Sequence, residues 1–186
     1  IVSIHMTSKG SGAYQAALLA QSMIKEEEPS AQVEVIDSRN VSLCQGWMVI
    51  EAARAALAGF RLQAVVAKVK SLIPVTRMIQ TADTLKYLYM GGRIGKAVNL
   101  VGTLLNIKPL IGMEDGEIVP LGAARGRVNA YKAIADRVHD AIGNGKAKIA
   151  YVHARAKQEV ETLKEIVEDK IEVVESIICE LSPALA

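Results

Sequence analysis

The fold is decided by residues 1–28, which read IVSIHMTSKGSGAYQAALLAQSMIKEEE. An apolar strand over residues 1–4 runs into a loop of glycine and serine at residues 7–12. Apolar residues then recur at helical spacing over residues 13–28, and the helix ends before Pro29. The stretch therefore predicts a strand, a glycine-containing loop and a helix, in that order.

Strands and helices continue to alternate along the chain. The first part adds a strand over residues 33–38 and helices over residues 45–58 and 62–72. After Pro74 the pattern predicts strands at residues 75–80, 107–113, 117–121, 148–153 and 171–178, and helices at residues 82–89, 95–105, 127–142 and 158–169. The Asp115-Gly116 pair favours a tight hairpin turn with positive φ. We expect an α/β fold with parallel βαβ packing.

Composition and charge exclude several classes of protein. Of the 186 residues, 51% are apolar and only 4% are aromatic, which indicates a folded protein with an aliphatic core. The 22 basic and 20 acidic residues are interspersed, without the basic cluster typical of nucleic-acid binding. No apolar run approaches the roughly 18 residues of a membrane span. Cys44 and Cys179 are isolated, which fits reduced thiols and a cytoplasmic location.

The loop at residues 7–12 is a candidate binding site. It lies between a strand and the start of a helix, where unpaired amides and the helix dipole favour an anion such as a carboxylate or phosphate. Alternatively, Ser8 or Ser11 only caps the helix. The loop contains neither a Walker A motif nor a complete GxGxxG, so a nucleotide site has little support.

Gly91-Gly92-Arg93 follows a predicted helix and is open to two interpretations. Either the glycines end the helix and the arginine is incidental, or Arg93 lies beside an anion, because guanidinium forms paired hydrogen bonds with carboxylates. Arg125 and Arg127 are compatible with solvated side chains and with an interaction surface. Asp37-Ser38 either orients a ligand hydroxyl or forms a turn.

The three histidines, His5, His139 and His153, share no metal-ligand spacing. No metal site is therefore indicated, and the sequence names no nucleophile with its base.

Several motifs, taken in order, resemble those of the DegV family. They are Ser3-Ile4-His5-Met6-Thr7-Ser8-Lys9-Gly10-Ser11-Gly12-Ala13-Tyr14-Gln15, Val35-Ile36-Asp37-Ser38, Gly91-Gly92-Arg93-Ile94, and Asn106-Ile107-Lys108-Pro109 with Asp115-Gly116. The resemblance covers nearly the whole chain. Several motifs in the correct order make it far more specific than any single motif would be.

The resemblance implies a two-domain architecture, with part of an N-terminal parallel-sheet domain at residues 1–73 and a C-terminal α/β domain at residues 74–186. It further implies that a long-chain fatty acid lies with its acyl chain in an apolar tunnel and its carboxylate at a polar end. Bacterial proteins of this family present the fatty acid to an ATP-binding kinase, which converts the carboxylate to an acyl phosphate. The chain would then be a carrier subunit rather than an enzyme, with no cofactor.

The resemblance also implies roles for single residues. Ser11 is similar to the family serine that hydrogen-bonds the carboxylate, Gly12 allows close approach, and Arg93 is similar to the arginine that supports this polar network. Arg125 matches a family arginine on the exposed face that engages the kinase. These residue types suit a fatty acid, because a buried carboxylate needs polar partners and each buried methylene contributes about 0.8 kcal/mol.

The chain departs from the family pattern at several points. The family's Leu-Ser-Gly-Thr reads Gly10-Ser11-Gly12-Ala13, and Met90 replaces the lysine that often precedes Gly-Gly-Arg. The family's upstream Thr-Ser-Gln-Pro segment and its C-terminal His-Thr-Gly-rich segment have no counterpart here. Because the chain also starts at Ile1 inside a predicted strand, we expect it to be a fragment.

Two other functions stay open at the level of sequence. A small α/β phosphotransfer or nucleotide-binding enzyme would use the loop from Ser8 to Gly12 as an anion cradle, with Arg93 and Lys96 nearby. An interaction module would instead dock through Arg125, Arg127 and the helix that follows.

Overall fold

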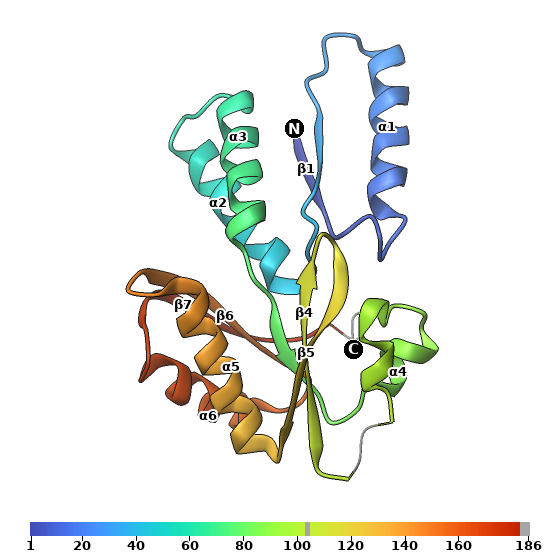
Figure 1. Ribbon diagram of the computed structural model, residues 1–186. Coiled ribbons are helices and arrows are strands. Elements are labelled where there is room, and N and C mark those ends of the chain that lie inside the picture. Colours follow the sequence, from blue (N-terminus) through green and yellow to red (C-terminus); the bar gives the residue numbers. More distant parts are fainter. Residues whose placement is uncertain (103–104, 183–186) are drawn as a thin grey trace. The chain divides into compact units, whose positions relative to one another are not determined.

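The computed structural model describes residues 1–102 and 105–182 (Figure 1). The chain forms two compact units. Unit 1 contains Ile1–Arg77 together with Met113–Glu117. Unit 2 contains Met78–Gly112 and the described residues from Ile118 onward. The predicted α/β class is confirmed, whereas the predicted domains at residues 1–73 and 74–186 stay a prediction.

Unit 1 is built on two strands and three α-helices. In chain order its elements are β1 (Val2–His5), α1 (Ala13–Glu27), β2 (Glu34–Asp37), α2 (Ser42–Leu57), α3 (Leu62–Leu72) and the 3-10 helix η1 (Ile73–Val75). The strands pair in parallel, with His5 opposite Asp37. Figure 1 shows α1 on one side of the strands and α2 with α3 on the other. Parallel pairing brings the loops that follow β1 and β2 to the same edge of the sheet.

The core of unit 1 is aliphatic, as the composition predicts. Ile36 of β2 packs with Met48 of α2 and with Val65, Val66 and Val69 of α3. Met48 and Val69 are completely buried. This core supports the strands from the side of α2 and α3.

Unit 2 contains two sheets. The first has the order β3 (Ile79–Thr81), β4 (Ile107–Glu114), β5 (Glu117–Arg125), and the second pairs β6 (Lys146–His153) in parallel with β7 (Glu172–Glu180). Its helices are α4 (Lys86–Met90), the 3-10 helix η2 (Gly95–Leu100), α5 (Arg127–Ile142) and α6 (Lys157–Glu168). β3 runs antiparallel to β4. The predicted Asp115-Gly116 turn is confirmed, because both residues have positive φ, 47° and 81°.

Three predicted elements differ from the structure around Pro74 and Gly95. The strand expected at residues 75–80 begins only at Ile79, because Pro74 lies in the 3-10 helix η1. The helix expected from residue 82 begins at Lys86, whose amide donates a hydrogen bond to the Thr84 hydroxyl oxygen at 3.1 Å. The helix expected at residues 95–105 is the 3-10 helix η2, and Leu104 lies outside the described residues.

Within the part of the chain that the structure describes, no helix combines the length and the apolar character needed to cross a bilayer.

Candidate functional site

The predicted site residues fall in both units. Ser11 and Gly12 lie between β1 and α1 in unit 1, whereas Arg93 and Arg125 lie in unit 2. The grouping of Ser11, Gly12 and Arg93 around one carboxylate stays a prediction, as does the partner-facing role of Arg125.

The Ser11 side chain forms a turn just before helix α1. Its Oγ accepts a hydrogen bond from the Ala13 amide at 3.2 Å, while Gly12 is the N-cap of α1, and no side chain caps the helix there. Ser11 therefore flanks the start of the helix and is not its N-cap. A serine hydroxyl accepts and donates at once, so this bond leaves the hydroxyl proton of Ser11 to donate elsewhere. The turn and ligand binding are thus compatible at Ser11.

Gly12 offers open space beside that hydroxyl. A Cβ placed on Gly12 would meet no atom within 4 Å, and its φ of −75° is accessible to any residue. Its lack of a side chain is therefore not required by the fold of unit 1.

The backbone amides from Ser8 to Ser11 are already bonded within the chain. Ser8 donates to Asp37 Oδ2 at 3.2 Å, and Lys9 donates to Thr7 Oγ1 at 3.3 Å. Gly10 and Ser11 both donate to the Thr7 carbonyl at 3.1 Å. An anion cradle requires such amides to point at the ligand. The expected phosphate cradle from Ser8 to Gly12 is therefore disfavoured, and the Ser11 hydroxyl is the more suitable donor.

Asp37 and Ser38 form turns rather than facing a ligand. Besides the Ser8 amide, the Asp37 carboxylate accepts the Arg39 amide at 2.8 Å, and Arg39 adopts a left-handed φ of 52°. Ser38 is completely buried, and its hydroxyl donates to the Asn40 carbonyl at 3.2 Å. The turn interpretation accounts for both side chains.

Arg93 follows a Schellman motif that ends α4. The Gly92 amide donates to Tyr89 O at 3.0 Å and the Arg93 amide donates to Leu88 O at 2.9 Å, while Gly92 has a φ of 70°. These two bonds define the motif, which requires a left-handed residue at the position of Gly92. The helix-ending interpretation is therefore confirmed for the glycines.

The Arg93 side chain is exposed, and one nitrogen of its guanidinium forms a hydrogen bond within the chain. Its Nη1 donates to the Gly91 carbonyl at 2.5 Å. Since a guanidinium has five N–H donors, others remain for an anion.

Arg125 is exposed at the end of β5, and its carbonyl accepts the Asn129 side-chain amide at 2.8 Å. The backbone then turns at Gly126, which has a φ of 80° and donates to the Asn106 carbonyl at 2.8 Å. The side chain of Arg125 is therefore accessible from solvent, whereas its contact with a kinase partner stays a prediction.

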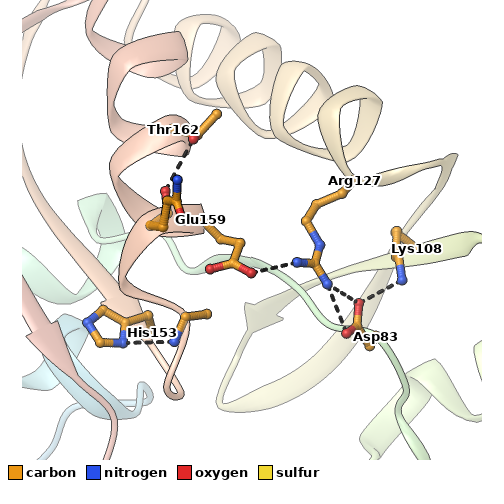
Figure 2. A network of polar contacts seen from close by, with 8 residues as sticks. Asp83, Lys108, Arg127, His153, Glu159 and Thr162 are labelled. Carbon is orange, nitrogen blue, oxygen red and sulfur yellow. Dashed lines mark hydrogen bonds and ion pairs between the residues drawn. The ribbon is translucent and has the colours of Figure 1, made fainter.

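A network of charged side chains in unit 2 joins three elements and the loop before α4 (Figure 2). The Arg127 Nη2 atom lies 3.0 Å from both Asp83 carboxylate oxygens, and its Nη1 lies 2.8 Å from Glu159. Lys108 Nζ donates to Asp83 at 2.6 Å. Hydrogen bonds from Lys108 and then from Arg127 lower the pKa of the Asp83 carboxyl. Arg127 is thus an ion-paired residue, which corrects its interpretation as simply solvated.

Sequence reasoning missed this network because its members are far apart in the chain. Asp83 precedes α4, Lys108 lies on β4, Arg127 begins α5 and Glu159 lies in the first turn of α6. The one available signal was Lys108 within the Ile107-Lys108-Pro109 motif.

The region also contains a histidine with a local role. The His153 ring nitrogen Nδ1 accepts the Ala156 amide at 3.3 Å just before α6 (Figure 2). Across residues 1–102 and 105–182, no three His, Cys, Asp or Glu side chains are grouped so that they could hold a metal ion.

Two solved structures with relevant ligands resemble this chain. A DegV family protein from Thermus thermophilus, described by its fatty acid binding, has a TM-score of 0.85 at 31% identity and covers 97% of this chain. A stearic acid-binding protein from Eubacterium ventriosum has a TM-score of 0.81 at 27% identity and covers 94%. This chain covers 63% and 61% of those two chains, respectively.

Sequence comparison gives the family directly. A DegV domain-containing protein from Clostridium acetobutylicum is 33% identical over 186 residues, which is 100% of this chain and 65% of that protein. Another from Caldanaerobacter subterraneus is 32% identical over 174 residues, covering 93% of this chain and 61% of the relative. This chain thus spans less than two thirds of the relatives' length. All of residues 1–186 match the family described as "Uncharacterised protein, DegV family". The chain therefore belongs to the DegV family.

Proposed function

We propose that this protein binds a long-chain fatty acid and carries it as cargo. The family supports the proposal, because relatives at 31% and 27% identity are described as binding a fatty acid and stearic acid. The largely aliphatic composition supports a tunnel for the acyl chain, since burying methylene groups is favourable.

The Ser11 hydroxyl carries the proposal for the carboxylate. Its oxygen accepts the Ala13 amide, and its proton is free to donate to a carboxylate oxygen. The N-terminus of the 15-residue helix α1 adds a favourable dipole for the negative charge. The open space at Gly12 leaves room for the head group. The family resemblance is the support for including Arg93 in this proposal, as a guanidinium that assists carboxylate binding.

A direct test compares Ser11→Ala with Ser8→Ala. Both remove a hydroxyl from the same loop, but Ser8 engages the loop through its backbone amide. The whole polypeptide encoded by the reading frame is delipidated and titrated with oleic acid and with its methyl ester. A hydrogen bond to a charged group contributes about 1.5–3 kcal/mol, so Ser11→Ala should weaken acid binding roughly 10- to 100-fold. Ester binding should change much less, because the ester has no charge.

Three results bear on the proposal. Preferential loss of acid binding in Ser11→Ala, with Ser8→Ala close to wild type, supports it. Equal losses in both variants refute the assignment to Ser11. Wild-type protein that binds neither oleic acid nor shorter and saturated homologues refutes fatty-acid carriage itself.

We also propose that the protein presents its fatty acid to an ATP-binding kinase rather than catalysing a reaction itself. In that step a carboxylate oxygen attacks the γ-phosphate of ATP, an acyl phosphate forms and ADP leaves. Arg125, exposed at the end of β5, would face the kinase. The free thiols of Cys44 and Cys179 support a cytoplasmic setting for this reaction.

Charge reversal tests the partner surface. Arg125→Glu should abolish co-purification with the cognate kinase and ATP-dependent acyl phosphate formation, measured by trapping with hydroxylamine. Lys86→Glu at the start of α4 is the matched control, because Lys86 is another exposed cation of unit 2 and lies outside α5. Wild-type kinase binding by Arg125→Glu would remove this residue from the interface.

A further inference from the structure

Thr7 is the first residue of the loop that carries Ser11, and it forms several of that loop's hydrogen bonds. Its carbonyl accepts the amides of Gly10 and Ser11, both at 3.1 Å, and its own amide donates to the Asn40 carbonyl at 2.9 Å. The backbone of Ser11 is therefore anchored to Thr7, and Thr7 is anchored to the loop after β2.

The Thr7 hydroxyl connects this loop to the tip of the β4–β5 hairpin. It donates to the Gly116 carbonyl at 2.7 Å and accepts the Lys9 amide at 3.3 Å. Thr7 is only 3% exposed and Gly116 is also buried, so loss of the hydroxyl would leave the Gly116 carbonyl without its partner in a buried place. All of these residues belong to unit 1.

The two neighbours of Gly116 reinforce the same contact. Asp115 pairs with Arg39 at 3.5 Å, and Glu117 pairs with Lys9 at 3.4 Å. Both pairs are solvent-exposed, so they contribute little by themselves. The buried Thr7–Gly116 bond is consequently the main polar link between the hairpin tip and the loop.

Gly116 is shaped for this contact. It has a φ of 81°, and a Cβ on it would lie 2.5 Å from Thr7 Oγ1. Any side chain at residue 116 would therefore push the Thr7 hydroxyl away from its position.

We infer that Thr7 is a positioning residue for ligand binding: by locking the Ser11 loop to the hairpin tip at Gly116, it sets the place from which the Ser11 hydroxyl meets a fatty-acid carboxylate. This inference rests on the proposed function. It assigns ligand affinity to two residues, Thr7 and Gly116, that need not touch the ligand.

The test measures the ratio of acid affinity to methyl ester affinity in Thr7→Val, Thr7→Ser and Gly116→Ala. Loss of stability alone weakens both ligands together and leaves this ratio unchanged, whereas displacement of Ser11 weakens only the acid. The ratio should fall about tenfold in Thr7→Val and Gly116→Ala, close to the Ser11→Ala value. Thr7→Ser keeps the hydroxyl and should stay within about twofold of wild type.

Val69→Ala is the control for stability. Val69 is completely buried in the core of unit 1, among residues of β2, α2 and α3, so this variant weakens unit 1 without removing a bond of the loop. Its ratio should equal that of wild type. If Thr7→Val does not fold, Gly116→Ala decides the comparison.

The outcomes separate the two levels of the argument. If Ser11→Ala lowers the ratio while Thr7→Val or Gly116→Ala leaves it at the wild-type value, the positioning role is overturned and fatty-acid binding stands. A Thr7→Ser ratio as low as that of Thr7→Val also overturns it, because the hydroxyl would then not be the cause. If the wild-type protein binds neither oleic acid nor its shorter and saturated homologues, the proposed function itself has failed.

Discussion

Replacing Gly95 with alanine should destabilise unit 2 through a close backbone approach. Gly95 has a φ of 55°, and a Cβ on it would lie 2.5 Å from the Ile118 carbonyl oxygen and 3.0 Å from the Ile118 nitrogen. These are backbone atoms of β5, so they cannot move aside as a flexible side chain can. Gly95, the first residue of η2, is therefore needed for the close packing of η2 against β5.

The magnitude follows from two contributions. A left-handed conformation costs a residue with a Cβ about 1–2 kcal/mol. Overpacking adds about 1–3 kcal/mol. We expect Gly95→Ala to lower the free energy of unfolding by about 2–5 kcal/mol.

Gly92→Ala separates these contributions. Gly92 has a φ of 70°, but a Cβ there would meet nothing within 4 Å, so only the conformational cost of about 1–2 kcal/mol applies. Both variants are unfolded in urea and followed by far-UV circular dichroism, and their midpoints are compared at a common slope. If Gly95→Ala is no less stable than Gly92→Ala, the close approach to Ile118 has no energetic weight and the reasoning is refuted.

Two further predictions concern ionisable groups. Lys108 and Arg127 lower the pKa of Asp83, so the stabilisation by its carboxylate is present above the unfolded pKa of about 3.9 and is lost as the pH falls through the lower folded pKa. Because Asp83 is 63% exposed, Asp83→Asn should cost less than about 1 kcal/mol at pH 7 and nothing at low pH in urea unfolding; a difference that grows on acidification contradicts this. Burial raises the pKa of the Cys44 thiol to about 11, so Cys44 should react slowly with Ellman's reagent at pH 8. If the reaction has a fast phase, Cys44→Ser should leave that phase intact. Loss of the fast phase in Cys44→Ser would contradict the prediction, because Cys44 would then be the fast-reacting thiol.

The sequence predicts well those parts of the fold where glycine or another turn-forming residue marks the end of a helix or strand. The helix α5 was predicted at residues 127–142 with its end marked by Gly143, and Gly143 adopts positive φ in the structure. The Asp115-Gly116 turn was equally predictable, since two consecutive positive φ angles favour these residue types.

The parts that escaped prediction depend on contacts between distant residues. No periodicity indicates that Arg127 pairs with Asp83 and Glu159, because the three lie far apart in the sequence, in α5, in the loop before α4 and in α6. The same holds for Thr7, whose bond to Gly116 spans 109 positions in the sequence. The role of Ser11 was predicted from a family resemblance, whereas its bond to the Ala13 amide and the bonds of the Ser8 amide and its neighbours required the structure.

Unit 1 is made of two separate stretches of the chain, Ile1–Arg77 and Met113–Glu117, and this limits how recombination can exchange it between relatives. The backbone passes between the units after Arg77, after Gly112 and after Glu117. A single crossover at Arg77 would therefore transfer a unit 1 without the five residues of the hairpin tip, leaving the Thr7 hydroxyl without its Gly116 acceptor. Recombination that exchanges the first 77 residues between relatives should succeed only when both parents place compatible residues at positions 7 and 116.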